Sequence, residues 1–119
     1  MKKVLVVDDS SLMVSVISNF IKKTGKEVEI ISAKDGQEAI EKFSQQKPDL
    51  VFMDIKMPVL DGMSALEKIR SMDPGSKVVM CTSLKEEDQE KKAIELGAAG
   101  YIMKPFSSAD ISDAINNNL

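Results

Sequence analysis

The sequence contains no histidine and no tryptophan, and it has a single cysteine, Cys81. One cysteine cannot form an intramolecular disulfide, and no CxxC motif is present to bind a soft metal. The absence of histidine removes the most common general base and the most common ligand of transition metals. A metal bound here would therefore be held by oxygen ligands, which is the coordination that Mg²⁺, Mn²⁺ and Ca²⁺ use.

The sequence also lacks long apolar runs and a strong charge of either sign. Its first apolar run, Val4–Val7, is too short for the core of a signal peptide and stops at Asp8. No stretch approaches the roughly 20 residues of a membrane-spanning helix, so we expect a cytoplasmic protein with no membrane partner. The net charge of −3 argues against a nucleic-acid surface, and we expect no nucleic-acid partner for these residues.

A chain of 119 residues predicts a single domain over residues 1–119. Five short apolar runs, expected to be strands, alternate with five patterns typical of helices. The runs lie at residues 4–7, 28–32, 50–53, 78–81 and 101–103. Most are apolar throughout, as expected for a parallel sheet covered on both faces, and the more mixed run at 28–32 is expected at an edge. The strict alternation predicts an α/β fold with a doubly wound sheet.

Helix-start signals precede three of the predicted helices. Asp35 with Glu38 resembles a capping box. Asp61 can cap the next helix, and Ser107 with Asp110 can start the last one. These signals place the helix boundaries close to the ends of the apolar runs.

The predicted helix over residues 84–96 differs from the others. Its first two turns are polar, and its apolar stripe of Ala93, Ile94 and Leu96 is thin. Such a pattern is typical of a solvated helix, and an element that is free to shift would show it too. We expect this helix to be weakly anchored.

Polar side chains follow several predicted strands at the point where each strand ends. These residues are Asp8, Asp9, Asp54, Thr82, Ser83 and Lys104. Because parallel strands end at the same edge of a sheet, we expect three carboxylates, two hydroxyls and one ammonium to converge there. Carboxylates in close quarters repel one another, and a hard divalent cation would relieve that repulsion. The sequence therefore predicts an acidic, cation-binding crevice.

Other interpretations of these residues are open but weaker. Taken alone, Asp9 or Thr82 could be a cap and Lys104 a surface group. A flavin-binding module needs phosphate donors after the first strand, where Asp8 and Asp9 would repel a phosphate. A haloacid-dehalogenase-type hydrolase needs an acid–base Asp two residues after its nucleophile, and that residue is Lys56. A dinucleotide enzyme needs GxGxxG, which is absent.

Taken as a set, the motifs of the crevice resemble those of response regulator receiver domains of two-component systems. The matching segments are Val7-Asp8-Asp9-Ser10, Asp54-Ile55-Lys56-Met57-Pro58, Asp61-Gly62, Thr82-Ser83 and Lys104-Pro105-Phe106. The resemblance covers the whole chain, and the single-domain chemotaxis type (CheY-like) is the most similar. It implies a flavodoxin-like (βα)5 fold whose parallel strands lie in the order 2-1-3-4-5.

The resemblance also implies the metal and acceptor residues. Asp54 would be the phosphoryl acceptor. Asp8, Asp9, Asp54 and the main-chain carbonyl of Lys56 would hold Mg²⁺, with Mn²⁺ as a possible substitute. Asp9 would bind the ion directly and Asp8 through water. In-line attack by a carboxylate on phosphorus depends mainly on positioning and electrostatics, so the missing histidine does no harm.

The remaining implied residues act on the phosphoryl group or respond to it. Lys104 would contact one phosphoryl oxygen and the hydroxyl of Thr82 another. Pro105 would follow a cis peptide bond at Lys104–Pro105. Tyr101 matches the aromatic switch position, so Thr82 and Tyr101 together would report the phosphorylated state.

The implied function is that of a phosphorylation-activated signalling switch, not an enzyme, although the domain would promote its own phosphorylation and dephosphorylation. The donor would be a sensor histidine kinase. The target would be a protein that docks on the face made by the helix over 84–96, the strand at 101–103 and the last helix, and the implied setting is chemotaxis. Either a monomer or a phosphorylation-dependent dimer fits. A stand-alone regulator, the receiver of a longer regulator and a phosphate sink all remain compatible with the residues.

Some residues depart from the family pattern. Ser83 stands where the family often has Ala or Gly, and its hydroxyl could crowd or hydrate the path of attacking water. Lys56 and Leu84 flank the phosphoryl site and are expected to tune hydrolysis. Val14-Ser15 stands where chemotaxis members often show Arg, which weakens a motor-binding assignment.

Overall fold

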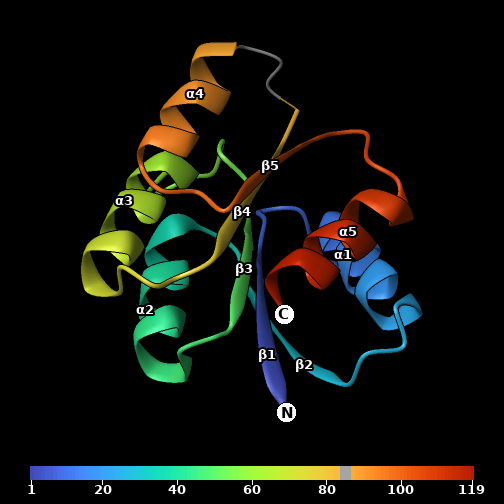
Figure 1. Cartoon of the computed structure of the whole chain (residues 1–119). Coiled ribbons are helices and arrows are strands. Elements are labelled where there is room, and N and C mark those ends of the chain that lie inside the picture. Colours follow the sequence, from blue (N-terminus) through green and yellow to red (C-terminus); the bar gives the residue numbers. More distant parts are fainter. Residues whose placement is uncertain (84–86) are drawn as a thin grey trace.

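The computed structural model describes residues 1–83 and 87–119 of the chain. Within these residues, strands and helices alternate strictly (Figure 1). The strands are β1 (Lys2–Val7), β2 (Val28–Ala33), β3 (Leu50–Met53), β4 (Val78–Thr82) and β5 (Gly100–Met103). The helices are α1 (Ser11–Lys23), α2 (Gly36–Gln46), α3 (Gly62–Met72), α4 (Glu87–Glu95) and α5 (Ser108–Asn118).

The strands form one parallel sheet in the order β2-β1-β3-β4-β5. This order confirms the predicted doubly wound, flavodoxin-like fold. Each predicted strand is present, with ends that differ from the apolar runs by at most two residues. The mixed strand β2 lies at one edge, as expected from its partly polar sequence, and β5 lies at the other.

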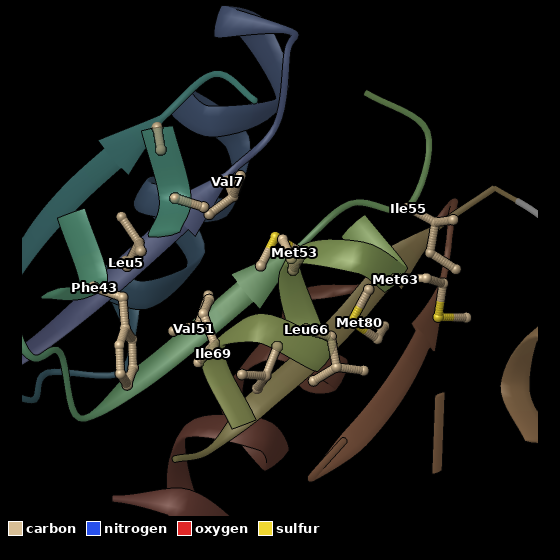
Figure 2. Packing of buried hydrophobic residues seen from close by; sticks show 14 of the residues in the cluster. Leu5, Val7, Phe43, Val51, Met53, Ile55, Met63, Leu66, Ile69 and Met80 are labelled. Carbon is tan, nitrogen blue, oxygen red and sulfur yellow. The ribbon is translucent and has the colours of Figure 1, made fainter. Parts of the chain in front are cut away.

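Helices cover both faces of the sheet (Figure 1). On one face, α2, α3 and α4 enclose a hydrophobic cluster that includes Phe43, Leu66 and Ala93 (Figure 2 shows much of this cluster). On the other face, α1 and α5 enclose a second cluster that includes Ile17 and Ile111. The strands β1, β3 and β4 are buried from both sides because their residues contribute alternately to the two clusters.

The predicted caps begin the helices for which they were expected. Asp61 accepts a hydrogen bond from the N–H of Ser64 at 2.8 Å, and Ser107 and Asp110 form a complete capping box. Asp35 accepts from the N–H of Glu38 at 2.8 Å, but the Glu38 carboxylate accepts from the N–H of Lys34. The predicted capping box of α2 is therefore only half formed, because its second bond goes to the residue before the cap.

Helix α4 has a thin apolar anchor, as its sequence predicts. Among its side chains from 89 to 95, only Ala93 is buried, whereas Ile94 is 52% exposed. Leu96, just beyond the helix, packs against the cluster from its rim. The helix was predicted to begin near Leu84, and residues 84–86 lie outside the described part of the chain.

None of the helices in residues 1–83 and 87–119 is long and apolar enough to cross a membrane.

Candidate functional site

The ends of β1 and β3 place two carboxylates side by side at one edge of the sheet. Val7 pairs with Met53 in the parallel ladder, so Asp8 and Asp54 follow neighbouring strand ends. The N–H of Asp54 donates to the carbonyl of Val7 at 3.0 Å, which extends the ladder by one residue. The main chain thus holds both side chains in the crevice that the sequence predicts.

Asp8, Asp9 and Asp54 form a compact acidic cluster. Each supplies a carboxylate oxygen, and these oxygens all lie within 4.8 Å of one another. Asp8 and Asp54 are buried, and Asp9 is exposed. One oxygen of Asp8 accepts from the N–H of Ser10 at 2.9 Å, and one oxygen of Asp54 accepts from the N–H of Ile55 at 2.8 Å. These bonds orient each carboxylate and leave its second oxygen for other partners.

Lys104 supplies the positive charge of the site. Its Nζ donates to Asp8 Oδ2 at 2.8 Å and lies 3.5 Å from Asp54 Oδ2. Burial alone would lower the pKa of this ammonium, but the hydrogen bond to Asp8 and the charges of Asp54 and Asp8 outweigh burial and raise it. Lys104 therefore stays protonated and bridges the two buried carboxylates.

The surroundings of Asp54 disfavour the ionised form of its carboxyl group. Burial raises the pKa of its carboxyl, and the charge of Asp8 adds to the rise, although Lys104 and the N–H of Ile55 oppose it. One ammonium thus leaves part of the acidic charge uncompensated. A divalent cation among the three carboxylates would supply the missing positive charge.

The donor set fits such a cation. Carboxylate oxygens are the ligands that Mg²⁺ prefers, and Mg²⁺ commonly uses one or two carboxylates and keeps several waters. The exposed side of the cluster, at Asp9, leaves space for those waters. Lys56, two residues after Asp54, is exposed, and its main-chain carbonyl remains a predicted ligand.

Thr82 and Lys104 are joined through the main chain. Thr82 ends β4 with a buried side chain, and its carbonyl accepts from the N–H of Lys104 at 2.8 Å. The Lys104–Pro105 peptide bond is cis. The neighbouring Ser83 is exposed. The structure thus brings the Thr82 and Lys104 segments together at the mouth of the crevice.

Tyr101 lies deeper in the sheet than the crevice residues. It pairs with Met80 in the β4–β5 ladder and packs, half-buried, against the cluster under α2, α3 and α4. Its proposed partner Thr82 lies on the neighbouring strand, and both residues already take part in interactions within the structure. The switch roles of Thr82 and Tyr101 remain predictions.

The segment from β3 to the start of α3 contains two residues with special backbone geometry, Gly62 and Val59. The N–H of Gly62 donates to the carbonyl of Ile55 at 2.7 Å, and a Cβ at position 62 would clash with the carbonyl of Asp54. Val59 has φ of +68°, which is unusual for a β-branched residue, and its side chain is 80% exposed. The motif Asp61-Gly62 was a signal for the first residue. No sequence signal indicated the second.

Cys81 is buried in β4 beside the site. Burial raises the pKa of its thiol, so the thiolate that reacts and binds metals is disfavoured. Cys81 therefore acts as an inert core residue.

Comparisons with known proteins agree with this geometry. The family model described as "Response regulator receiver domain" matches residues 4–116. The chain is similar to a chemotaxis protein CheY of Halobacterium salinarum, with 43% identity over 119 residues that cover 99% of this chain and 97% of that protein. The Bacillus subtilis chemotaxis protein CheY is 38% identical over 98% of this chain and 97% of its own length.

A solved structure shows the same fold. The CheX-CheY-BeF3-Mg+2 complex from Borrelia burgdorferi contains a chain that superposes with a TM-score of 0.91 at 30% identity, covering 98% of this chain and 87% of that one. These similarities extend over the sheet and all the helices described above.

Proposed function

The chain belongs to the response regulator receiver domain family and is of the CheY type, and from this premise we propose that it is a phosphorylation-activated switch whose phosphoryl acceptor is Asp54. The observation that carries the proposal is the position of Lys104. Its ammonium lies 2.8 Å from Asp8 and 3.5 Å from Asp54, beside a cluster of three carboxylates. An ammonium in this position can bind the negatively charged oxygens of an incoming phosphoryl group.

The proposed reaction is an in-line displacement at phosphorus. One Asp54 oxygen attacks the phosphorus of a phosphohistidine on a sensor kinase, and an oxygen–phosphorus bond forms. The bond between phosphorus and the histidine nitrogen breaks, and its electron pair stays on the imidazole. The N–H of Ile55 holds the other Asp54 oxygen at 2.8 Å and so orients the nucleophile.

The neighbouring residues then stabilise the charge on the phosphoryl oxygens. Bound Mg²⁺, held by Asp8, Asp9, Asp54 and the Lys56 carbonyl, would neutralise that charge. Lys104 exchanges its bond with Asp8 for one with a phosphoryl oxygen. Thr82 donates its hydroxyl to another oxygen, since β4 ends beside β3 at the same edge of the sheet.

Support for a cation and a phosphoryl-like group at this site comes from a relative. The Borrelia complex is described as containing CheY, BeF3 and Mg+2 together with CheX. By similarity, we propose Mg²⁺ as the cofactor here and a protein partner that recognises the face formed by α4, β5 and α5. The similarity to chemotaxis proteins makes a chemotaxis pathway the favoured setting. We further propose that residues 1–119 form one receiver domain.

Intact mass spectrometry tests the proposal directly. The protein and its Asp54→Asn variant are incubated with Mg²⁺ and acetyl phosphate, with and without a chelator. We expect one added phosphoryl group in the wild type alone, and none when the chelator is present.

If neither protein gains a phosphoryl group, self-catalysed transfer from a small donor is overturned. A second incubation with Mg²⁺ and beryllium fluoride, followed by NMR, then separates two cases. Shift changes around Asp54 would indicate a receiver that accepts only from its kinase. Unchanged spectra would indicate a crevice that binds a cation and accepts no phosphoryl group.

A further inference from the structure

Lys104 can receive an incoming phosphoryl group only if its ammonium is already held beside the two buried carboxylates when the group arrives. The distances of 2.8 Å to Asp8 and 3.5 Å to Asp54 define that position. A lysine side chain has a flexible four-carbon stem, which does not by itself hold the charge in one place. The main chain that carries Lys104 must therefore be anchored on both sides of the residue.

On the N-terminal side of Lys104, the main chain is anchored by pairing with the sheet. The N–H of Lys104 donates to the carbonyl of Thr82, so this residue continues the pairing of β5 with β4. After Lys104 the chain leaves the sheet. Pro105 has no N–H to donate and is exposed, as is Ser107. Phe106, which is half-buried, is the residue of this loop that the fold covers.

The ring of Phe106 meets the ring of Phe20 on α1. Their centroids are 6.2 Å apart and the ring planes cross at 73°, which is the edge-to-face arrangement that aromatic pairs prefer. The ammonium of Lys23 lies over the Phe20 ring, 5.8 Å from its centroid. Both rings also pack against the hydrophobic cluster between α1, α5 and the sheet. In Figure 1, α1 and α5 lie next to each other on that side of the sheet.

This ring pair joins two segments that carry opposite charges of the site. Helix α1 follows Asp8 and Asp9 almost directly, and the loop with Phe106 follows Lys104. We propose that the Phe20–Phe106 contact is a positioning contact, which holds the loop of residues 104–107 against α1 and so places the Lys104 ammonium between the two buried carboxylates. Its effect on phosphoryl transfer rests on the function proposed above.

Four single variants and the double variant Phe20→Leu/Phe106→Leu test the contact. Phe20→Leu and Phe106→Leu each remove one ring and keep an apolar side chain, and Phe20→Tyr keeps the ring. Phe43→Leu is the matched control, because Phe43 is a buried ring in the cluster on the opposite face of the sheet. The first measurement is the ¹⁵N NMR signal of the Lys104 ammonium in metal-free protein. The second is the rate of Asp54 phosphorylation by acetyl phosphate at saturating Mg²⁺.

The wild type and Phe43→Leu should both show a distinct Lys104 ammonium signal, because a hydrogen bond and partial burial slow its exchange with water. Phe20→Leu and Phe106→Leu should broaden or lose that signal. They should also lower the phosphorylation rate about three- to tenfold, the factor that corresponds to an edge-to-face ring pair. The double variant should lose no more than either single variant, since both disrupt one contact. Phe20→Tyr should keep the wild-type signal and rate.

A Lys104 signal that persists in both Leu variants, or that changes equally in Phe43→Leu, would overturn the proposal. If Phe106→Leu fails to fold, Phe20→Leu decides, because it removes the same ring contact from the side of α1. If the wild type accepts no phosphoryl group, the proposed function fails, and the ammonium signal still decides whether the ring pair positions Lys104.

Discussion

At the scale of single residues, Asp54 occupies a position that disfavours its own charge. Burial raises the pKa of its carboxyl, and the neighbouring Asp8 charge adds to this effect. The ammonium of Lys104 compensates part of the cost at 3.5 Å. The ionised form of Asp54 is therefore disfavoured in the metal-free protein. A bound cation, alone or together with a phosphoryl group, would reduce this electrostatic cost.

Removal of the Asp54 charge should stabilise the metal-free protein. Because the folded state raises this pKa above the ordinary 3.8, the native protein binds the proton more tightly than the unfolded chain does. The contribution of Asp54 to stability therefore falls as pH rises through the window between these two values. We expect Asp54→Asn to unfold at higher urea concentration than wild type at pH 7 with EDTA, and the difference should shrink toward pH 4.

The variant Asp9→Asn is the control, because Asp9 is exposed and should change stability less. Saturating Mg²⁺ should stabilise the wild type more than Asp54→Asn, since binding to the native state alone adds to stability. An Asp54→Asn protein that is less stable than wild type in EDTA at pH 7 would contradict this account.

Lys104 should weaken cation binding at the site where we propose that it assists phosphoryl transfer. Its ammonium and a bound Mg²⁺ share Asp8 and Asp54, so the two positive charges repel. We expect Lys104→Met to bind Mg²⁺ about fivefold more tightly or better, which corresponds to a coupling of roughly 1 kcal/mol. Isothermal titration calorimetry measures the affinity.

The same variant should lose most of the phosphorylation rate with acetyl phosphate. Lys26→Met is the control for net charge, because Lys26 is an exposed residue between α1 and β2. Equal Mg²⁺ affinity in the two variants would mean that the effect is a change in overall charge and not the loss of the contact.

At the scale of elements, the start of α5 is fixed by a local device. The Ser107 hydroxyl accepts from the N–H of Asp110 at 3.3 Å, and the Asp110 carboxylate accepts from the N–H of Ser107 at 2.9 Å. This capping box directly follows Lys104, Pro105 and Phe106 in the chain. It therefore sets where the loop ends and the helix begins.

Ser107→Ala should lower the free energy of unfolding by about 1 kcal/mol, the usual cost of a lost N-cap. Ser108→Ala is the matched control, because it lies one residue inside the helix and is also exposed. Urea denaturation followed by circular dichroism measures both. If the two variants lose the same stability, the capping box contributes nothing specific to α5.

At the scale of the whole molecule, the site and the proposed output face share one sheet. Asp54 follows β3, Thr82 ends β4, and Lys104 follows β5, so a change at the proposed phosphoryl site would reach the strand beside α4 through the segments of Thr82 and Lys104. Among residues 89–95 of α4 only Ala93 is buried, whereas α3 buries five residues, among them Leu66 and Ile69. Such a difference allows α4 to move while α3 stays in place.

We expect the active arrangement of α4 and β5 to be rare before phosphorylation and dominant after it. Such a reversal requires about 5.5 kcal/mol of preference. A few charge-assisted hydrogen bonds from Lys104 and Thr82, each roughly 1.5–3 kcal/mol, are of the right size.

Hydrogen exchange with and without Mg²⁺ and beryllium fluoride tests this expectation. Amide protection should change in α4 and β5 and stay constant in α2, which serves as the internal control on the same face of the sheet. Equal exchange of α4 in the two states would refute the shift.

The sequence by itself determined the class of fold and the chemistry of the crevice. Apolar runs in strict alternation with helical patterns require a parallel sheet buried on both faces, and residues that end parallel strands meet at one edge for geometric reasons. The carboxylates of Asp8, Asp9 and Asp54 could therefore be placed together in advance. Helix caps such as Asp61 and Ser107 were also predictable, because their bonds are local.

Only the tertiary structure decided contacts between residues far apart in the chain. That Lys104 bonds to Asp8, 96 residues away, more closely than to Asp54 depends on strand register and loop path. Likewise, the meeting of Phe20 with Phe106 follows from how α1 packs beside the loop before α5. Periodicity shows which face of an element is buried. Which side chain it meets there is set by the packing of all the elements together.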